Sequence, residues 1–589
     1  MKQINEKTIP YIKWGLSALL ALCVASFFAF SYRYHLYFHE QNQLMLLTWD
    51  YFLKAVSVPG GLSDWMGEFI VQFFRLVYPA ALILGIFIAK VQVYSAKLIG
   101  KFSGQDGMAV WVLGFIPAVL VLLHLVSDNA IVGGAVALLL CISLLYCLTL
   151  IENDRIRMII GVASVFVIYW MAGPLALLNV VGMIAYEILV RRSLSPIFIA
   201  AVVLVAVLSP IVSHSFVSAG YPEFFHGLHY GRMNSEVAWW LWSADLVLCL
   251  ILLLAAASTL FRPLGEKLSL TLAAVMVLVT ALSAFKLVGS VRGDATERTL
   301  MYDKLYVDAE YDSIISEYAK ELPKEPYSAL VYNNIAMALK GSLLNDMFTV
   351  PQRGVSGLVS EYEGGYFAQI ACAEALLQVG FTSTAHRLFF EAQESVPDFR
   401  KTARCYKALA RTNIVMGYEE SARKYLDALS HTLFYKHWAK ETISLLGQEN
   451  AINEHPIYGP LRKRMPKNFD MLFNSDNLTR PLGMLCIENP SNPIAVQYLI
   501  AYSLLSRDLN SFANFYGSAS FRDQPRACQE AIAMVPGHPK ATEGAVNRFR
   551  QFNLDIQQKK DASYMKRTYG DSYWYYYSTM QAQNAQKQK

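Results

Sequence analysis

The chain has 589 residues, of which 54% are hydrophobic and 16% are charged. Soluble proteins carry about 25% charged residues, so the composition excludes an ordinary soluble enzyme. The net charge of +5 is too small for this length to indicate nucleic-acid binding, and no nucleic-acid partner is expected. Charged residues are sparse up to about residue 290 and reach ordinary density after it. We therefore predict a membrane-embedded half followed by a water-exposed half.

Nine apolar segments of the first half approach the length of about 20 residues that crosses a bilayer. Lys and Arg gather on the loops at one end of these segments, on the same side as the N-terminus. Because cytoplasmic loops are enriched in basic residues, we expect a cytoplasmic N-terminus and a periplasmic distal half in a bacterial inner membrane. The predicted spans are 11–31, 69–93, 108–127, 130–150, 158–172, 174–190, 196–213, 237–260 and 269–290.

The segment 158–190 is long for one span and short for two, and Gly173-Pro174 interrupts it. Basic residues on both sides favour two crossings joined by a turn. A broken re-entrant pair is the alternative. Glu187, near the inner end, is expected to extend beside Arg191 and Arg192.

Four ionisable residues lie toward the outer ends of predicted spans, where burial is costly and function is the default interpretation. Arg75 and Lys286 could bind the phosphate of a membrane lipid. His124 and Asp245 are the other intramembrane polar candidates. The plainer alternative is that all four extend to the interface or form structural pairs, such as Arg75 with Asp245.

The first outer loop carries four carboxylates, at Glu40, Asp50, Asp64 and Glu68. The apolar periodicity of residues 43–56 predicts a helix that lies at the membrane interface. Asp64 and Glu68 are four residues apart and would share a helix face, and close carboxylates raise the pKa of one partner. The alternative is a helix-dipole role for Asp64 and a simple interfacial charge at Glu68.

The distal half shows amphipathic helices separated by short breaks. Two of its stretches align without gaps at an offset of 37 residues. The coinciding small residues are Ala373, Gly380 and Ala385 in the first stretch and Ala410, Gly417 and Ala422 in the second. This pattern resembles the tetratricopeptide repeat, whose stacked helix pairs form a solenoid. The resemblance implies a periplasmic protein or peptide partner.

The predicted fold is therefore all-α, with a polytopic membrane domain of about nine spans and an extracytoplasmic helical-repeat domain. We expect five segments along the chain. They are a transmembrane domain over 1–291, a repeat region over 292–450, a Pro-rich connection over 451–490, further repeats over 491–580 and a disordered polar tail over 581–589.

This arrangement is similar to some polytopic glycosyltransferases of the GT-C class. The resemblance implies a lipid-linked sugar, a polyprenyl-phosphate sugar, as donor and an acidic residue of the first outer loop as base or metal ligand. Glu40 stands at the expected position, with Asp50 and Asp64 as substitutes. The chain also resembles a family of bacterial polytopic proteins with a PGGLxD segment, here Pro59 to Asp64, which implies no activity.

Motifs for nucleotide, dinucleotide or zinc-protease chemistry are absent from the sequence. His226 and His229 lie three residues apart, but no third ligand has an obligatory spacing. We assign no cofactor and no metal ligand, and the transferase hypothesis leaves a divalent metal open. The second hypothesis is a non-catalytic membrane scaffold whose repeats bind a protein partner in envelope assembly or transport.

Overall fold

The computed structural model describes residues 8–232, 236–258, 266–322, 327–359, 365–397, 400–468, 477–518 and 524–587. Within these ranges the regular elements are helices and no strand forms, as the all-α prediction requires. The chain divides into two compact units. The first comprises Met1–Asp294 with the short segments Pro397–Arg400 and His431–Phe434, and the second comprises the remaining residues.

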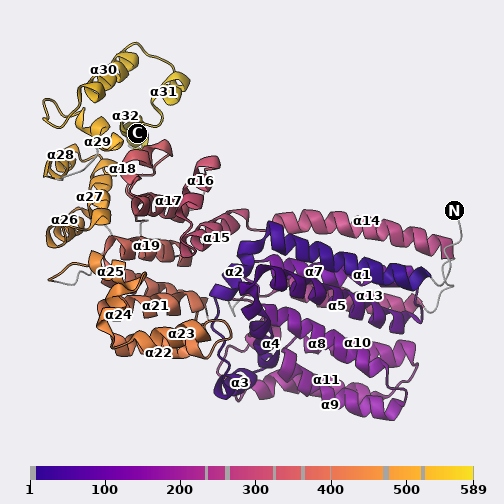
Figure 1. Cartoon of the computed structure of the whole chain (residues 1–589). Coiled ribbons are helices and arrows are strands. Elements are labelled where there is room, and N and C mark those ends of the chain that lie inside the picture. Colours follow the sequence, from indigo (N-terminus) through magenta and orange to yellow (C-terminus); the bar gives the residue numbers. More distant parts are fainter. Residues whose placement is uncertain are drawn as a thin grey trace. The chain divides into compact units, whose positions relative to one another are not determined.

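The first unit is a bundle of long apolar helices that lie side by side, with α2, α3 and α4 at the end away from the N-terminus (Figure 1). Its α-helices are α1 (Ile9–Ser26), α2 (Arg33–Gln41), α3 (Trp49–Val56), α4 (Gly61–Gln72), α5 (Val77–Ser103), α6 (Met108–Leu113), α7 (Phe115–Val126), α8 (Val132–Thr149), α9 (Asp154–Ala172), α10 (Ala176–Ala185), α11 (Pro196–His214), α12 (Glu223–His226), α13 (Trp239–Ser258) and α14 (Glu266–Val291).

Eight helices within the described ranges are long and apolar enough to cross a membrane. They indicate a membrane protein. The remaining predicted span, 174–190, corresponds to the apolar helix Ala176–Val190, which is shorter than the roughly 17 residues that a span needs. The eight are Ile9–Ser31, Val77–Ser103, Met108–Val126, Val132–Thr149, Asp154–Ala172, Pro196–His214, Trp239–Ser258 and Ser269–Val291.

The second long helix begins later than predicted. Residues from Gly61 form the separate helix α4, and a 3-10 turn over Phe73–Arg75 precedes α5. Leu76 has an extended backbone (φ −106°, ψ 96°), which interrupts the helical hydrogen bonds. The prediction that Arg75 lies inside a span is therefore wrong: it is exposed, in the turn before α5.

The predicted interfacial helix also begins later than expected, at Trp49. Thr48 caps it, because its Oγ1 accepts a hydrogen bond from the backbone N–H of Tyr51 (3.3 Å). Trp49 and Leu53 are exposed, with 69% and 46% of their surface accessible. This helix thus presents an apolar face, as an interfacial helix would.

The segment 158–190 forms a helical hairpin of α9 and α10. Its turn lies at Gly173, whose φ of 78° favours glycine, and it packs against Gly60. At the other end of the hairpin, Arg157 Nε donates to Glu187 Oε1 (2.5 Å). The predicted placement of Glu187 beside Arg191 is thus corrected, because α9 supplies a buried guanidinium that reaches Glu187 directly.

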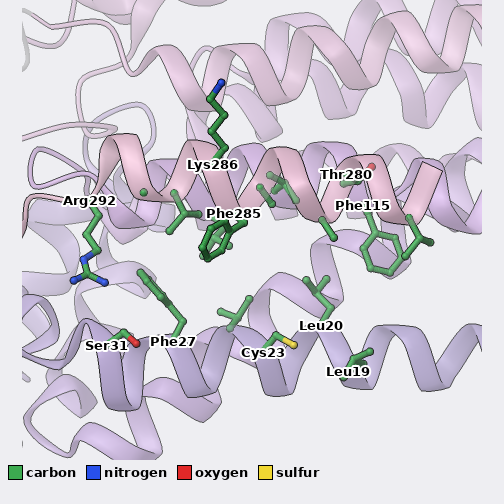
Figure 2. A pocket seen from close by; sticks show the side chains of 18 of the residues that line it. Leu19, Leu20, Cys23, Phe27, Ser31, Phe115, Thr280, Phe285, Lys286 and Arg292 are labelled. Atoms are coloured by element: carbon green, nitrogen blue, oxygen red, sulfur yellow. The ribbon is translucent and has the colours of Figure 1, made fainter. Parts of the chain in front are cut away.

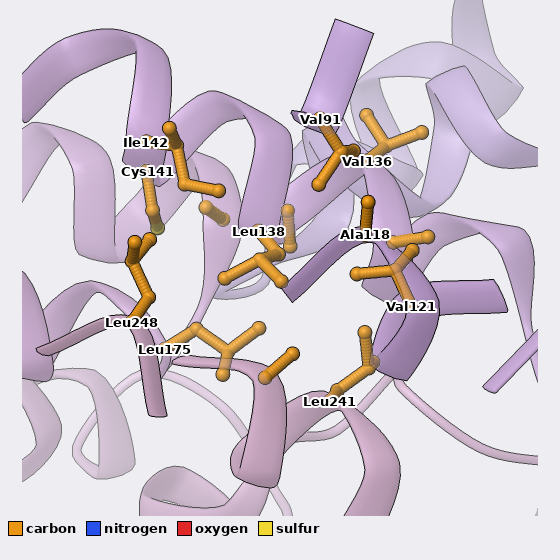
Figure 3. Packing of buried hydrophobic residues seen from close by; sticks show 14 of the residues in the cluster. Val91, Ala118, Val121, Val136, Leu138, Cys141, Ile142, Leu175, Leu241 and Leu248 are labelled. Atoms are coloured by element: carbon orange, nitrogen blue, oxygen red, sulfur yellow. The ribbon is translucent and has the colours of Figure 1, made fainter. Parts of the chain in front are cut away.

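A cleft of about 810 Å³ runs between α1, α7 and α14 (Figure 2). Elsewhere the unit is closely packed around apolar side chains from several helices (Figure 3). Val91 of α5, Val121 of α7, Leu138 of α8 and Leu248 of α13 are at most 3% exposed. Such packing, and not exclusion from water, holds helices together where the surroundings are lipid.

The helices α4 and α8 cross at a contact between two glycines. A Cβ added to Gly67 would lie 2.3 Å from the backbone N of Gly133, and a Cβ on Gly133 would lie 2.7 Å from the Cα of Asp64. Small residues permit this close approach. The crossing presses the face of α4 that carries Asp64 and Glu68 into the bundle.

The second unit consists of further helices, arranged partly as hairpins. Gly380 ends α19 and Gly417 ends α21, each with a positive φ. The predicted close-packing positions Ala373, Ala385, Ala410 and Ala422 are fully buried. The helices are α15 (Asp294–Val307), α16 (Tyr311–Lys320), α17 (Tyr327–Lys340), α18 (Leu343–Asp346), α19 (Tyr366–Val379), α20 (Thr382–Glu394), α21 (Ala403–Met416), α22 (Glu419–Ser430), α23 (Lys436–Leu445), α24 (Glu449–Glu454), α25 (Tyr458–Arg464), α26 (Thr479–Glu488), α27 (Pro493–Leu505), α28 (Leu509–Ser518), α29 (Arg526–Ile532), α30 (Glu543–Gln557), α31 (Ala562–Tyr569) and α32 (Tyr573–Lys587).

Two predicted irregular segments contain helix. The segment 451–490 carries α25 and α26, because Pro460 and Pro481 fall in their first turns, where proline is tolerated. The predicted disordered tail 581–589 continues α32 as far as Lys587. Its Ala, Gln and Lys residues are good helix formers, which polarity alone does not reveal.

We expect Gly67→Ala to destabilise the protein, because the new methyl group meets backbone atoms of α8 that cannot rotate away. Overpacking of this kind costs about 1–3 kcal/mol. Gly15→Ala in α1 is the matched control, since nothing lies within 4 Å of its added Cβ. It should be neutral or slightly stabilising. Thermal unfolding of the full-length variants in detergent checks both; equal stability of the two variants would contradict the α4–α8 crossing.

Candidate functional site

The three predicted catalytic carboxylates occupy different environments. Glu40 lies buried in α2 and accepts a hydrogen bond from the side chain of Gln41. Asp50 is exposed in the first turn of α3. Asp64 is buried in α4, where it faces the N-terminal end of α8. The structure therefore does not bring the three together, and it singles out Asp64 together with Glu68.

The predicted intramembrane residues are likewise separate. Lys286 is exposed on α14. His124 Nε2 lies 3.0 Å from the backbone oxygen of Ile131 and joins the end of α7 to the start of α8. Asp245 is buried in α13 and, among the described residues, its Oδ2 has no hydrogen-bond partner. The unpartnered Oδ2 gives no support to the alternative of a pair between Asp245 and Arg75, which lies in the turn before α5.

Asp64 and Glu68 form a buried acidic pair on one face of α4, as their spacing predicted. Each residue is only 9% exposed. The hydroxyl of Tyr51, from α3, donates to Glu68 Oε2 (2.6 Å), and the side-chain amide of Gln43 donates to the Glu68 backbone oxygen (2.8 Å). The loop and helix before α4 therefore cover Glu68.

A guanidinium and an imidazole face the same pair. Arg400, in a short segment that belongs to the first unit, places Nη2 3.2 Å from Asp64 Oδ2 and Nη1 3.6 Å from Glu68 Oε1. His229 Nδ1 lies 3.5 Å from Asp64 Oδ2. The other Asp64 oxygen, Oδ1, is buried without a hydrogen-bond partner among the described residues. A buried acceptor in this condition is available to a ligand donor or to water.

The surroundings of the acidic pair shift the pKa of Glu68. Burial, followed by the charge of Asp64, raises the pKa of Glu68 to about 7, while Arg400 and the Tyr51 hydroxyl oppose the rise. Burial and the Glu68 charge also raise the pKa of Tyr51 well above its usual value. The site thus holds a carboxyl group that exchanges a proton near neutral pH, beside a carboxylate paired with a cation.

A second polar cluster lies at the same end of the bundle, around α2. His39 Nε2 lies 2.9 Å from His35 Nε2, and Arg232 Nη2 lies 3.0 Å from His39 Nδ1. The His35 ring also stacks on the ring of Tyr32, and its Nδ1 lies 3.3 Å from Asp128 Oδ1. Burial, with the charges of His35 and Arg232, lowers the pKa of His39 well below its usual value, so its ring is neutral at physiological pH.

Neither cluster has the geometry of a metal centre. No group of three or more His, Cys, Asp or Glu side chains converges as metal ligands within the described ranges. His229 faces Asp64, whereas His226 uses its backbone oxygen to accept from Trp242 Nε1 (3.0 Å). What the acidic pair can do is transfer a proton, because a carboxyl group with a pKa of about 7 next to a second carboxyl group is the arrangement of a general acid–base site.

Several residues of these clusters were missed from the sequence. His35 and His39 are four residues apart, and this spacing on one helix face was a usable signal. Arg400 gave none, because it is 336 positions from Asp64 and stands in an ordinary polar stretch. Tyr51 was hidden as one aromatic among the many in the loop.

We expect Glu68→Gln to remove a pH dependence of stability. An acid whose pKa is raised by folding, here from 4.5 to about 7, stabilises the fold most below the lower value and loses that contribution as the pH rises. Glutamine imitates the neutral form. The melting temperature of the variant relative to the native protein should therefore increase between about pH 5 and pH 8.

Thermal unfolding of the full-length protein in detergent across this range makes the measurement. Asp50→Asn, at an exposed position of the neighbouring helix, is the control and should follow the native curve. If the difference in melting temperature between Glu68→Gln and the native protein stays constant with pH, the raised pKa of Glu68 is contradicted.

The comparisons with known proteins give a family and no activity. No curated protein and no solved structure matches the chain. A model of a protein family matches residues 7–580, nearly the whole length, and the family is described as one of unknown function. This agrees with the predicted resemblance to a family without an assigned activity. The chain belongs to the family of unknown function DUF6057.

Proposed function

We propose that this membrane protein is a GT-C-like glycosyltransferase that uses a lipid-linked sugar, with Asp64 and Glu68 as its acid–base pair. The observation that carries the proposal is the buried pair itself, in which Glu68 has a pKa raised to about 7. Buried carboxyl groups with pKa values shifted by a second carboxylate are characteristic of acid–base catalysis.

The chemistry assigns a role to each carboxyl group. An acceptor hydroxyl attacks the anomeric carbon, the bond from that carbon to the phosphate oxygen breaks, and polyprenyl phosphate leaves. The hydroxyl proton passes to Glu68, which is substantially ionised at neutral pH. Asp64, beside Arg400 and His229, stabilises positive charge that develops on the sugar.

Unused hydrogen-bonding capacity at the pair supports a ligand site. Asp64 Oδ1 is buried and has no hydrogen-bond partner among the described residues, so it can accept from a sugar hydroxyl. Glu40 is the alternative base on account of its place in the first outer loop. Asp50 is a weaker candidate because it is exposed. Arg75 and Lys286 are the cations first proposed for the lipid phosphate, and both are exposed.

The orientation belongs to the same proposal. We place the protein in the bacterial inner membrane with the N-terminus in the cytoplasm, because the basic loops lie on that side. The acidic pair and the histidine cluster then lie at the periplasmic end of the bundle, where lipid-linked sugars would be met. The second unit, as a periplasmic array of divergent tetratricopeptide-like repeats, would present the acceptor or its carrier.

A reporter that is active only in the periplasm tests the orientation. Alkaline phosphatase fused after Arg292 should be active, and the same enzyme fused after Arg192 should be inactive, since these positions follow α14 and α10 at opposite ends of the bundle. The reverse pattern, or equal activity at both positions, would overturn the proposed orientation.

The alternative function is a non-catalytic scaffold whose repeats bind a periplasmic protein or peptide. It is favoured by the helical hairpins α19–α20 and α21–α22. In each hairpin a glycine ends the first helix, and buried alanines pack the two helices together. Hairpins of this kind stack into arrays with extended binding surfaces. Both functions make use of the second unit, and only the transferase needs the acidic pair.

We expect Glu68→Gln to lower sugar transfer by about 10²–10⁴-fold, the usual contribution of a general base. Asp64→Asn should also lower it, because the charge that stabilises the sugar is lost. The assay uses full-length protein in vesicles with a polyprenyl-phosphate sugar and measures polyprenyl phosphate by mass spectrometry.

Asp50→Asn serves as the matched control and should retain native activity. Elution as a single folded species in detergent separates lost chemistry from lost structure. Loss of transfer in Glu40→Gln alone would move the base to α2. Full activity in both Glu68→Gln and Asp64→Asn would contradict the catalytic assignment, and no transfer by the native protein would leave the scaffold as the better function.

A further inference from the structure

The cleft between α1, α7 and α14 has the dimensions of a lipid chain. Its wall on the span Ile9–Ser31 extends from Leu16 to Ser31, which at about 1.5 Å per residue covers about 22 Å. One leaflet of the hydrocarbon core is about 15 Å thick. The cleft volume of about 810 Å³ falls in the range of roughly 300–1,000 Å³ that ligand sites occupy.

The walls of the cleft are almost entirely apolar. Leu20 on α1 and Phe27, just after it, face Phe285 on α14 across the opening (Figure 2). Water in such a space would find few hydrogen-bonding partners, and an empty cleft would forfeit dispersion contacts on both walls. Because the helices that form it are apolar enough to span a membrane, the surroundings supply hydrocarbon to fill it.

One end of the cleft is polar and carries the guanidinium of Arg292 beside the carboxylate of Asp294. Arg292, just past α14, turns toward Ser31, at the end of the π-helical turn Phe27–Ser31 that follows α1 (Figure 2). Its Nε donates to Asp294, and its guanidinium lies 5.8 Å from the ring centre of Tyr32. Among the described residues, the two Nη groups have no hydrogen-bond acceptor. The N–H groups of a guanidinium can form two parallel hydrogen bonds to the oxygens of one phosphate.

Lys286 is placed differently from Arg292. It stands among the residues around the cleft, but its side chain points away from the opening (Figure 2). Its ammonium group therefore cannot meet a headgroup whose chain lies between α1 and α14. Arg292 and Lys286 can therefore be compared directly, because only Arg292 is directed toward the end of the cleft.

We propose that this cleft binds a phosphate-bearing lipid, with one chain between α1 and α14 and the phosphate at the Nη groups of Arg292. Charge complementarity selects this occupant over a neutral lipid, and the length of the apolar wall selects a long chain. The proposal concerns binding alone. It stands whether or not Asp64 and Glu68 catalyse transfer, and it moves the lipid phosphate from Arg75 and Lys286 to Arg292.

Cys23 is a natural reporter of the cleft, since it lines the α1 wall and is exposed. Cys147, exposed on α8 and absent from the cleft lining, is the matched control. Purified full-length protein in detergent is treated with N-ethylmaleimide, and labelling of each cysteine is followed by peptide mass spectrometry. We expect phosphatidylglycerol to slow labelling of Cys23 at least threefold relative to Cys147, and diacylglycerol to have little effect.

The charge variants separate the two ends of the site. Arg292→Gln should abolish the difference between the two lipids, Asp294→Asn should preserve or strengthen it, and Lys286→Gln should leave it unchanged. The charge substitutions lie at the exposed end of α14, where they leave the helix packing intact.

Each other result would overturn the proposal. Equal protection by both lipids would mean a hydrocarbon groove without a phosphate site, and protection of both cysteines would mean general coating by lipid. If labelling of Cys23 slows without added lipid as the protein concentration rises, the occupant of the cleft is a second copy of the chain. Failure of the transferase assay is distinct from all of these, because labelling of Cys23 measures no chemistry.

Discussion

The contact between Gly67 and Gly133 is the constraint on which the acidic site depends. Two backbones that approach this closely leave no room for a side chain between α4 and α8 at this point. Asp64, one turn before Gly67, is held against Gly133, and Glu68, next to Gly67, is covered by Tyr51 and Gln43 of the preceding segment. Burial is in turn the largest cause of the raised pKa of Glu68. The packing around α4 therefore sets the protonation of Glu68.

The largest polar clusters of the first unit lie at the ends of its helices, while single buried polar contacts such as Ser17 with Gln92 lie farther along the helices. In a bilayer a buried donor or acceptor must be satisfied within the protein, and this is easiest where helices end and free backbone groups are at hand. The histidine cluster follows this rule: His35 meets the backbone oxygen of Leu125, and Arg232 meets that of Asp128. Asp245 departs from it, with one carboxylate oxygen unpartnered among the described residues.

Much of the fold was predictable from hydropathy and charge. The long apolar helices, the hairpin at Gly173 and the buried alanines of the distal half all follow from local patterns. The errors have local causes as well. The break at Leu76 lies just before Pro79 in the first turn of α5, and the predicted span 69–93 ran through this signal of a helix start. Proline near helix starts and glutamine-rich helix near the C-terminus were both taken for irregular structure.

The sequence by itself determined the class of protein, the helical periodicity and the sharing of one helix face by Asp64 and Glu68. These properties depend on neighbours along the chain, which a periodicity of 3.6 residues describes. Only the tertiary structure decided which carboxylates are buried, that Tyr51, His229 and Arg400 face the acidic pair, and that Arg292 rather than Lys286 turns toward the cleft. These facts depend on how separate helices pack, because burial and the distance between charges are set by residues far apart in the chain.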